Sequence, residues 1–246
     1  MAFLNSAHLC LEEIPRSDAK TPDLRINGGL PDETLLEIKS KEDDPEFMAW
    51  LDSELESDKP VTYSKPANYW NTLAGVIMAG IEQLKQRDPS RTRLRALWID
   101  CSGSHSDLLQ TRLHATLYGT RTLSCKGRPH VVTYFYFENS SFFRHRFELD
   151  GVVISCNGDA GLNLNDYSPH FARIKASGFC KACQDAIYYP QQFSQNDDYM
   201  FNDSTEPRGD DERTLNYLRK KYRISDIQTF DMKMLAGVMR VPKNPV

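Results

Sequence analysis

Several stretches of the chain carry apolar residues at the spacing of an α-helix. The longest predicts a helix over Asn68–Gln86, which Asp88-Pro89 would end because the residue before a proline disfavours helical backbone. The others predict a short helix within Met1–Ile14, one after Pro45, one from Ser168-Pro169 to about Pro190, and one capped by Asp210 or Asp211.

Between these helices, the pattern from Arg93 to Cys156 is typical of β-strands. Leu94–Ile99 is a continuous apolar run, and Val131–Phe137 is rich in aromatic and β-branched residues. Asp150-Gly151 lies between two apolar runs and predicts a tight hairpin, since both residues tolerate turn backbone. Further strands are expected at Leu113–Tyr118 and Arg121–Cys125, although Asp107–Leu117 could equally be helical.

Strands that follow one another without helices between them predict antiparallel pairing. We therefore expect an α+β fold, with an antiparallel β-sandwich core clasped by several helices and an N-terminal helical arm. The expected division is an acidic arm with short helices over residues 1–65 and a core with flanking helices over residues 66–246, within a single structural domain. No apolar run reaches the ~18 residues of a membrane-spanning helix, and the first residues lack the basic region of a secretory signal.

The chain of 246 residues has 30 basic and 34 acidic residues, unevenly placed. Residues 31–60 carry a formal charge of -8 and residues 85–146 carry +7. Three interpretations follow: neutralisation within one molecule, neutralisation between copies, and an RNA-binding sheet on which Tyr134, Tyr136 or Phe143 would stack with bases. We favour neutralisation within the molecule as an account of the charges alone, because paired surface charges are common.

The six cysteines do not form a zinc-finger pattern. Cys180 and Cys183 have CxxC spacing, but no second CxxC or histidine pair accompanies them. They continue the apolar face of a predicted helix, which favours buried thiols over metal ligands or a redox pair.

One loop has the composition of an active site. Asp100-Cys-Ser-Gly-Ser-His105 follows the Leu94–Ile99 strand, and Cys101 or Ser104 as nucleophile with His105 as base would suit a hydrolase or transferase. The same residue types are ordinary turn formers, and no third orienting group can be identified, so we expect a structural turn and assign no catalytic residue or metal ligand. His145, between two arginines, is expected on a strand surface.

A family resemblance lies in the second half of the chain. The run Phe143-Arg-His-Arg-Phe-Glu-Leu149, followed by short strands and by a helix with Cys180, Cys183 and Tyr188-Tyr189, resembles cypovirus (cytoplasmic polyhedrosis virus) polyhedrin. The resemblance covers about 50 residues. It implies a compact β-sandwich clasped by helices and a non-enzymatic structural role.

The resemblance implies a matrix protein of viral occlusion bodies, the polyhedra of an insect virus. Its partners would be copies of itself, as trimers in a crystalline lattice, and virus particles, in the host cell cytoplasm. No membrane or sequence-specific nucleic acid is expected as a partner and no cofactor is required, although bound nucleotides are known in that family. Ionisation of cysteine, tyrosine and lysine would favour dissolution above about pH 10–11. The alternatives are the hydrolase or transferase and the RNA-binding module.

Overall fold

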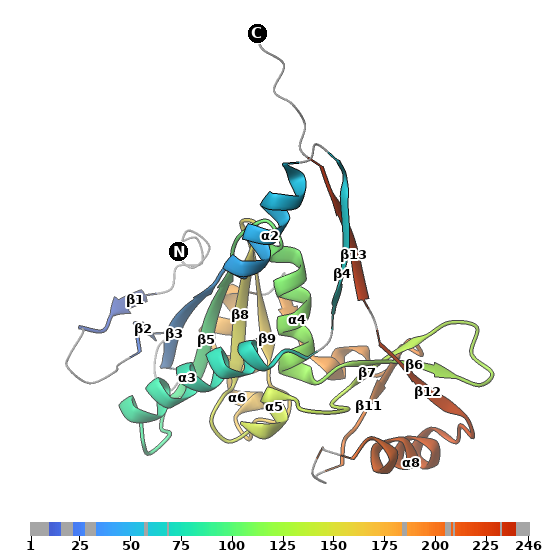
Figure 1. Ribbon diagram of the computed structural model, residues 1–246. Coiled ribbons are helices and arrows are strands. Elements are labelled where there is room, and N and C mark those ends of the chain that lie inside the picture. The colour runs from blue at the N-terminus through green and yellow to red at the C-terminus, as the bar shows by residue number, and fades with distance from the viewer. Residues whose placement is uncertain are drawn as a thin grey trace.

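The computed structural model describes residues 10–15, 22–27, 33–56, 59–67, 69–183, 186–204, 208, 210–231 and 233–239. Within them, the chain forms three β-sheets and seven α-helices (Figure 1). The helices are α2 (Pro45–Leu55), α3 (Asn71–Arg87), α4 (Ser106–Tyr118), α5 (Ser141–Arg144), α6 (Phe171–Ala176), α7 (Gly178–Ala182) and α8 (Asp211–Tyr222), and a 3-10 turn, η2, spans Pro190–Phe193.

The largest sheet has seven strands in the order β1-β2-β3-β5-β8-β9-β10. The three central strands, β3, β5 and β8, are parallel, and β9 and β10 form a further parallel pair, whereas the remaining neighbours are antiparallel. Their bounds are β1 (Cys10–Glu13), β2 (Leu24–Asn27), β3 (Thr34–Lys41), β5 (Leu94–Cys101), β8 (Gly151–Cys156), β9 (Asp159–Leu164) and β10 (Ile187–Tyr188).

Helices cover both faces of this sheet. Leu97 and Ile99 of β5 pack in one core cluster with apolar residues of α3 and α4, whereas Ala96 and Trp98 pack in another with residues of α6 and α7. Successive side chains of a strand point to opposite faces, which explains the alternation along β5. Because helices cover both faces, both sets of side chains are apolar, and the sequence of β5 is one continuous apolar run. The result is a three-layer arrangement, with α3 and α4 on the viewer's side in Figure 1.

Two smaller sheets complete the described structure. A four-stranded sheet has the order β11-β7-β6-β12, with strands β6 (Arg121–Cys125), β7 (Val132–Phe135), β11 (Tyr199–Phe201) and β12 (Ile227–Phe230). Its apolar face packs on α8 through Leu218. The antiparallel ribbon of β4 (Val61–Pro66) and β13 (Lys233–Val238) rises beside α2 and α4 (Figure 1).

The expected antiparallel sandwich is wrong. Residues 106–118 are helical, so of the two alternatives for this stretch the helix is confirmed and the strand at Leu113–Tyr118 is not found. The connection from β5 to β8 includes α4, and a connection of that length can carry the chain back to the start of the sheet and set two strands parallel. The coarser expectation of a mixed helix and strand protein is confirmed.

The hairpin expected at Asp150-Gly151 is also wrong. Gly151 begins β8, and the tight turn lies one strand later, at Asn157 and Gly158, whose φ angles are +53° and +93°. Asp150 is fully buried: it accepts hydrogen bonds from Nη2 of Arg91 and from the backbone N–H of Arg95, each at 2.8 Å, and from the Ser168 hydroxyl. The carboxylate therefore joins three segments instead of forming a turn.

The acidic N-terminal segment is only partly the expected helical arm. Its second apolar cluster does form a helix, α2, which begins with Pro45 and has Asp44 as its N-cap. Residues 34–41, however, form β3 in the centre of the main sheet, where Leu35 and Leu36 are buried on opposite faces. Of the helix expected within residues 1–14, residues 1–9 lie outside the described part, and residues 10–13 form β1. The division at residue 65 stays a prediction.

Most of the other expected elements are confirmed. Helix α3 ends where Asp88 caps it, β5 and β6 lie where their apolar runs predict, and Asp210 accepts a hydrogen bond from the Arg213 backbone N–H as the N-cap of α8. The helix expected from Ser168 to about Pro190 is only partly found. It is divided into α6 and α7, because Ser177 adopts extended backbone and caps the second helix through the Cys180 N–H. Its expected last part is wrong, since α7 ends at Ala182 and Ile187–Tyr188 form strand β10. Residues 227–230 and 233–238 form strands β12 and β13.

Candidate functional site

The candidate site lies where the parallel strands end. Lys41, Cys101 and Cys156 are paired across β3, β5 and β8, so the segments that follow these strands leave the sheet at one edge. In sheets with parallel strands, ligands bind preferentially outside the carboxyl ends of the strands. The loop from Asp100 to His105, singled out by its composition, leaves the sheet at this edge.

The first two residues of that loop are structural. Asp100 accepts a hydrogen bond from the Ser155 hydroxyl at 2.5 Å, and Ser155 in turn accepts one from the Trp98 indole N–H at 2.8 Å. The thiol of Cys101 is buried, and burial raises its pKa to about 12. Cys101 therefore stays a neutral thiol near pH 7, and it does not suit the nucleophile considered for it.

His105 lies between two side chains that are distant in sequence. Its Nδ1 atom is 3.2 Å from Oδ1 of Asp43, its backbone N–H donates to Oδ2 of the same carboxylate at 3.2 Å, and its Nε2 atom is hydrogen-bonded to the Tyr63 hydroxyl. The side chains of His105 and Asp43 are only 9% and 11% exposed. Asp43, His105 and Tyr63 thus form a polar chain, which we call the His105 relay.

The two ends of the relay act differently on the imidazole. No aligned hydrogen bond reaches the buried Nδ1 atom within the described part of the chain, so Asp43 acts on it mainly as a nearby negative charge. This charge favours a proton on Nδ1, which leaves the Nε2 lone pair for Tyr63. Burial, and secondly the negative charge of Asp43, raise the pKa of the Tyr63 phenol, so Tyr63 is a neutral hydrogen-bond donor.

A glycine lets the loop approach Asp43. Gly103 has φ of +103°, which side-chain-bearing residues rarely adopt, and a Cβ atom there would lie 2.5 Å from Oδ2 of Asp43. Gly103 therefore allows the turn to bring the His105 backbone N–H to the carboxylate. The ring centroid of Phe47 lies 5.0 Å from that of Tyr63 and 5.3 Å from that of His105, which shields the relay from water on that side.

A cavity of about 430 Å³ opens beside the relay. Apolar side chains from α2, α4 and β13 supply most of its wall, together with two aspartates, and in the described part of the chain no lysine or arginine lines it. The lining residues are Met48, Leu51, Asp52, Leu55, Tyr63, Ser104, His105, Asp107, Leu108, Gly237 and Val238. Ser104 is exposed there, and its hydroxyl has no hydrogen-bond partner among the described residues.

The remaining candidates are not brought into this site. Tyr134 and Tyr136 are buried, and Phe143 is 8% exposed, so these rings are not free to stack on nucleic-acid bases as the RNA-binding alternative expected. Cys180 and Cys183 are buried in the core beneath the main sheet, which confirms the expectation of buried thiols. His145 follows the short helix α5 instead of lying on a strand, and burial lowers its pKa.

Sequence reasoning found His105 and missed both of its partners. Asp43 is one of three consecutive acids, Glu42-Asp43-Asp44, and nothing local distinguishes it from its neighbours. Tyr63 lies in a strand with an alternating exposure pattern, and the sequence does not show that this strand returns to α4. The described residues contain no group of three or more histidine, cysteine, aspartate or glutamate side chains suited to hold a metal ion.

No helix in the described part of the chain is both long and apolar enough to cross a bilayer. Comparison of the chain with models of known protein families, with curated proteins and with solved structures finds no match.

Proposed function

We propose that the protein is a hydrolase of uncharged, apolar carboxylic esters or amides, and that the His105 relay is its catalytic centre. The observation that carries this proposal is the chain Asp43–His105–Tyr63, which ends at a cavity beyond the carboxyl ends of β3 and β5. An acid, an imidazole and a hydroxyl in this order are the groups that nucleophilic catalysis needs.

The relay supports the following reaction. His105 Nε2 takes the Tyr63 proton while the phenol oxygen attacks the acyl carbon, and Asp43 stabilises the imidazolium that forms. The protonated Nε2 then gives its proton to the leaving alcohol or amine, which leaves an acyl group on Tyr63. Water, deprotonated by the same nitrogen, releases the acid and restores the phenol. The free Ser104 hydroxyl in the cavity can donate a hydrogen bond to the developing oxyanion.

The cavity lining indicates the substrate class. Leu51, Leu55 and Leu108 supply apolar wall, whereas Asp52 and Asp107 would repel a negatively charged substrate. A carboxylic ester or amide with a short to medium alkyl chain fits both features better than a phosphoric ester does.

The experiment is the hydrolysis of p-nitrophenyl acetate, butyrate and octanoate by the whole chain, compared with p-nitrophenyl phosphate. We expect turnover of the carboxylic esters and not of the phosphate, with a loss of at least ~10²-fold in kcat/KM for His105→Asn and for Tyr63→Phe. The chain offers a matched control: His130 also lies 2.5 Å from an aspartate, Asp198, but it is half-exposed and does not line the cavity, so His130→Asn should keep full activity.

Self-assembly is a second candidate, favoured by large apolar side chains that are exposed among the described residues. These are Trp50, Met78, Val131, Phe147, Phe230 and Met239, each 42% to 62% exposed. Such side chains suit contacts between copies of the chain, as an occlusion-body matrix protein would need. Expression of the chain alone tests this candidate: dense crystals in the cytoplasm, insoluble at neutral pH, would support it, and a monomer at high concentration would count against it.

A further inference from the structure

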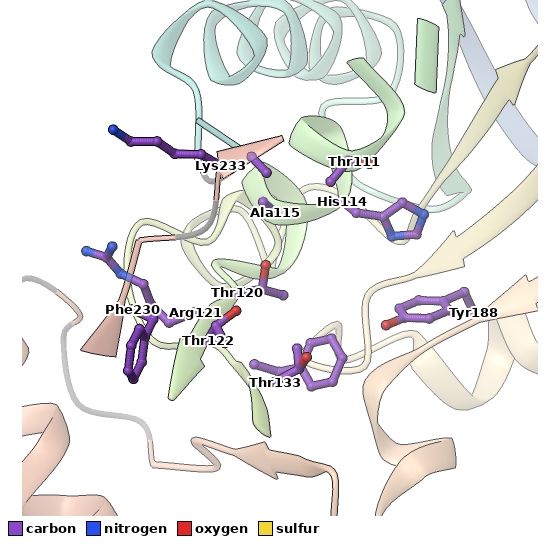
Figure 2. Close-up of a pocket in the computed structure, with 12 residues that line it drawn as sticks. Thr111, His114, Ala115, Thr120, Arg121, Thr122, Thr133, Tyr188, Phe230 and Lys233 are labelled. Carbon is purple, nitrogen blue, oxygen red and sulfur yellow. The ribbon is translucent and has the colours of Figure 1, made fainter. Parts of the chain in front are cut away.

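A second cavity, of about 510 Å³, is lined by residues farther along α4, toward its C-terminal end, than those beside the relay. Thr111, His114 and Ala115 of α4 contribute to it, and most of the remaining wall comes from the four-stranded sheet and β10 (Figure 2). Its lining residues are Ala67, Thr111, His114, Ala115, Thr120, Arg121, Thr122, Thr133, Phe135, Tyr188, Phe230 and Lys233. It is of the size that small organic ligands occupy in proteins.

The sheet presents a row of side chains to this cavity. Phe230, Thr122 and Thr133 are cross-strand partners on β12, β6 and β7, so they lie side by side on one face of the sheet. Phe230 is 46% exposed, although it lies in the lining of a cavity. A bound ring would cover part of this apolar surface.

Several polar groups in the cavity have no protein partner. Among the described residues, no hydrogen bond involves the hydroxyls of Thr120, Thr122, Thr133 and Tyr188 or the ring nitrogens of His114. The His114 ring centroid is 5.0 Å from that of Tyr188 in an edge-to-face contact, and Figure 2 shows the two rings at one end of the cavity. Unengaged donors and acceptors beside aromatic rings are the usual composition of a small-molecule site.

The charges of the site favour a neutral ligand. Burial lowers the pKa of His114 to about 4, so its imidazole is uncharged near pH 7 and offers one donor and one acceptor. Arg121 is paired with Glu138 at 3.0 Å and with Asp231 at 2.7 Å. Figure 2 shows the charged ends of Arg121 and Lys233 directed away from the cavity.

We propose that this cavity binds an uncharged heteroaromatic compound, whose ring lies against Phe230 and whose polar groups meet the hydroxyls of Thr122 and Thr133, while Tyr188 and His114 form the other end of the cavity (Figure 2). Apolar ring faces would be buried against the aromatic side chains, and ring nitrogens or a carboxamide would satisfy the free hydroxyls. An anion or a cation would lose its hydration without gaining a counter-charge in the cavity. This site is separate from the His105 relay and does not depend on its activity.

The test uses three bicyclic compounds of nearly equal shape and different charge: quinoline-3-carboxamide, quinoline-3-carboxylate and 1-methyl-3-carbamoylquinolinium. Binding to the whole chain is measured by saturation-transfer NMR and by calorimetric titration at pH 7. We expect saturable binding of the neutral amide, and binding at least tenfold weaker for the anion and the cation. Absence of saturable binding by all three, or preference for a charged member, would overturn the proposal.

Substitutions assign the binding to this cavity. Thr122→Val keeps the shape and removes one hydroxyl, so we expect about three- to tenfold weaker binding of the amide, the range of one hydrogen bond. Thr62→Val, at an exposed position of β4 outside both cavities, is the matched control and should bind as the unsubstituted chain does. Equal binding by Thr122→Val, with equal thermal stability, would place the ligand elsewhere and contradict the proposal.

Discussion

The Nδ1 atom of His105 lies 3.2 Å from the carboxylate of Asp43, and the two residues are 62 positions apart in the sequence. Because the carboxylate is nearly buried, its charge acts on the imidazole with little screening by water. We expect Asp43→Asn to lower kcat for ester hydrolysis by about 10²-fold or more and to change KM little, since the imidazolium forms only during the reaction.

The control for this prediction is Asp44→Asn. Asp44 precedes α2 and caps it by accepting a hydrogen bond from the Glu46 N–H at 3.1 Å, and it makes no contact with His105 in the described structure. This variant should lose only a fraction of the helix-cap energy, about 0.5 kcal/mol, and keep its kcat. An equal fall in kcat for both variants would mean that the acidic segment acts through stability and not through the relay.

A second prediction concerns the buried carboxylate that joins three segments. Asp150→Ala leaves Arg91 and the Arg95 backbone N–H without their acceptor, so we expect a loss of roughly 3–5 kcal/mol in the free energy of unfolding. Urea unfolding followed by circular dichroism measures it. Asp159→Ala, at an exposed position of the β8–β9 hairpin, should change the same quantity by less than about 0.5 kcal/mol. A loss below about 1 kcal/mol for Asp150→Ala would contradict this account of Asp150.

A third prediction follows from Asp166. Burial raises its pKa from 3.8 to about 6, against the hydrogen bonds from the Tyr136 hydroxyl and the Gln191 N–H, which favour the charged form. The Asp166 carboxyl group therefore binds its proton more tightly in the folded state than in the unfolded state. The contribution of Asp166 to stability is therefore fully present below about pH 4 and is lost as the pH rises through 6, by roughly 3 kcal/mol.

Asp166→Asn isolates this contribution. Subtracting its free energy of unfolding from that of the unsubstituted chain should give a difference that falls between pH 4 and pH 6 and is constant above pH 7. A difference that stays constant, or rises with pH, would mean that Asp166 is well solvated in the folded protein.

The fourth prediction concerns thiol reactivity. Cys101, Cys125, Cys156, Cys180 and Cys183 are free thiols and buried, and burial raises the pKa of Cys101 and of Cys183 to about 12. In a Cys10→Ser background, which removes the one thiol outside this set, the folded protein should react with Ellman's reagent at least ~10²-fold more slowly than the unfolded chain. Rapid reaction of one thiol in the folded state would show a reactive cysteine that the structure does not contain.

The fifth prediction concerns alkali, where the self-assembly candidate requires dissolution. Tyr118 and Tyr136 are buried, and burial raises the pKa of each phenol well above 10. Unfolded tyrosines ionise near pH 10, so stability is present below that pH and falls as the pH rises beyond it. The part of the tyrosinate absorbance that comes from these buried phenols should therefore rise together with unfolding in a single cooperative step. Ionisation of every tyrosine near pH 10 without unfolding would contradict the burial of these rings.

Local patterns in the sequence predicted the helices and strands well, but not the way in which the strands pair. Leu94–Ile99 and Asn68–Gln86 are found as β5 and α3 because each carries a long and regular apolar pattern. The direction of β8 depends on whether residues 107–117 are helical, and the two alternatives were equally compatible with the sequence. If residues 107–117 were a strand, an antiparallel sandwich would be expected. Because they form helix α4, β5 and β8 can be parallel neighbours in the main sheet.

Of the candidate site, only the loop that carries His105 could be predicted from the sequence. His105 follows a buried strand among small residues, a local pattern that directs attention to the loop. Its partners depend on long-range geometry: Asp43 comes from the end of β3, and Tyr63 from a strand that pairs with β13 near the end of the chain. The chemistry of Cys101 likewise depends on its burial in the folded protein.

Rapid-quench mass spectrometry of the chain mixed with p-nitrophenyl butyrate tests the central claim most directly. The account predicts a butyryl group on the peptide that contains Tyr63 within the first turnover, formed together with a burst of p-nitrophenol, and neither signal in His105→Asn. An unmodified Tyr63, together with equal p-nitrophenol release by the unsubstituted chain and by His105→Asn, would contradict it.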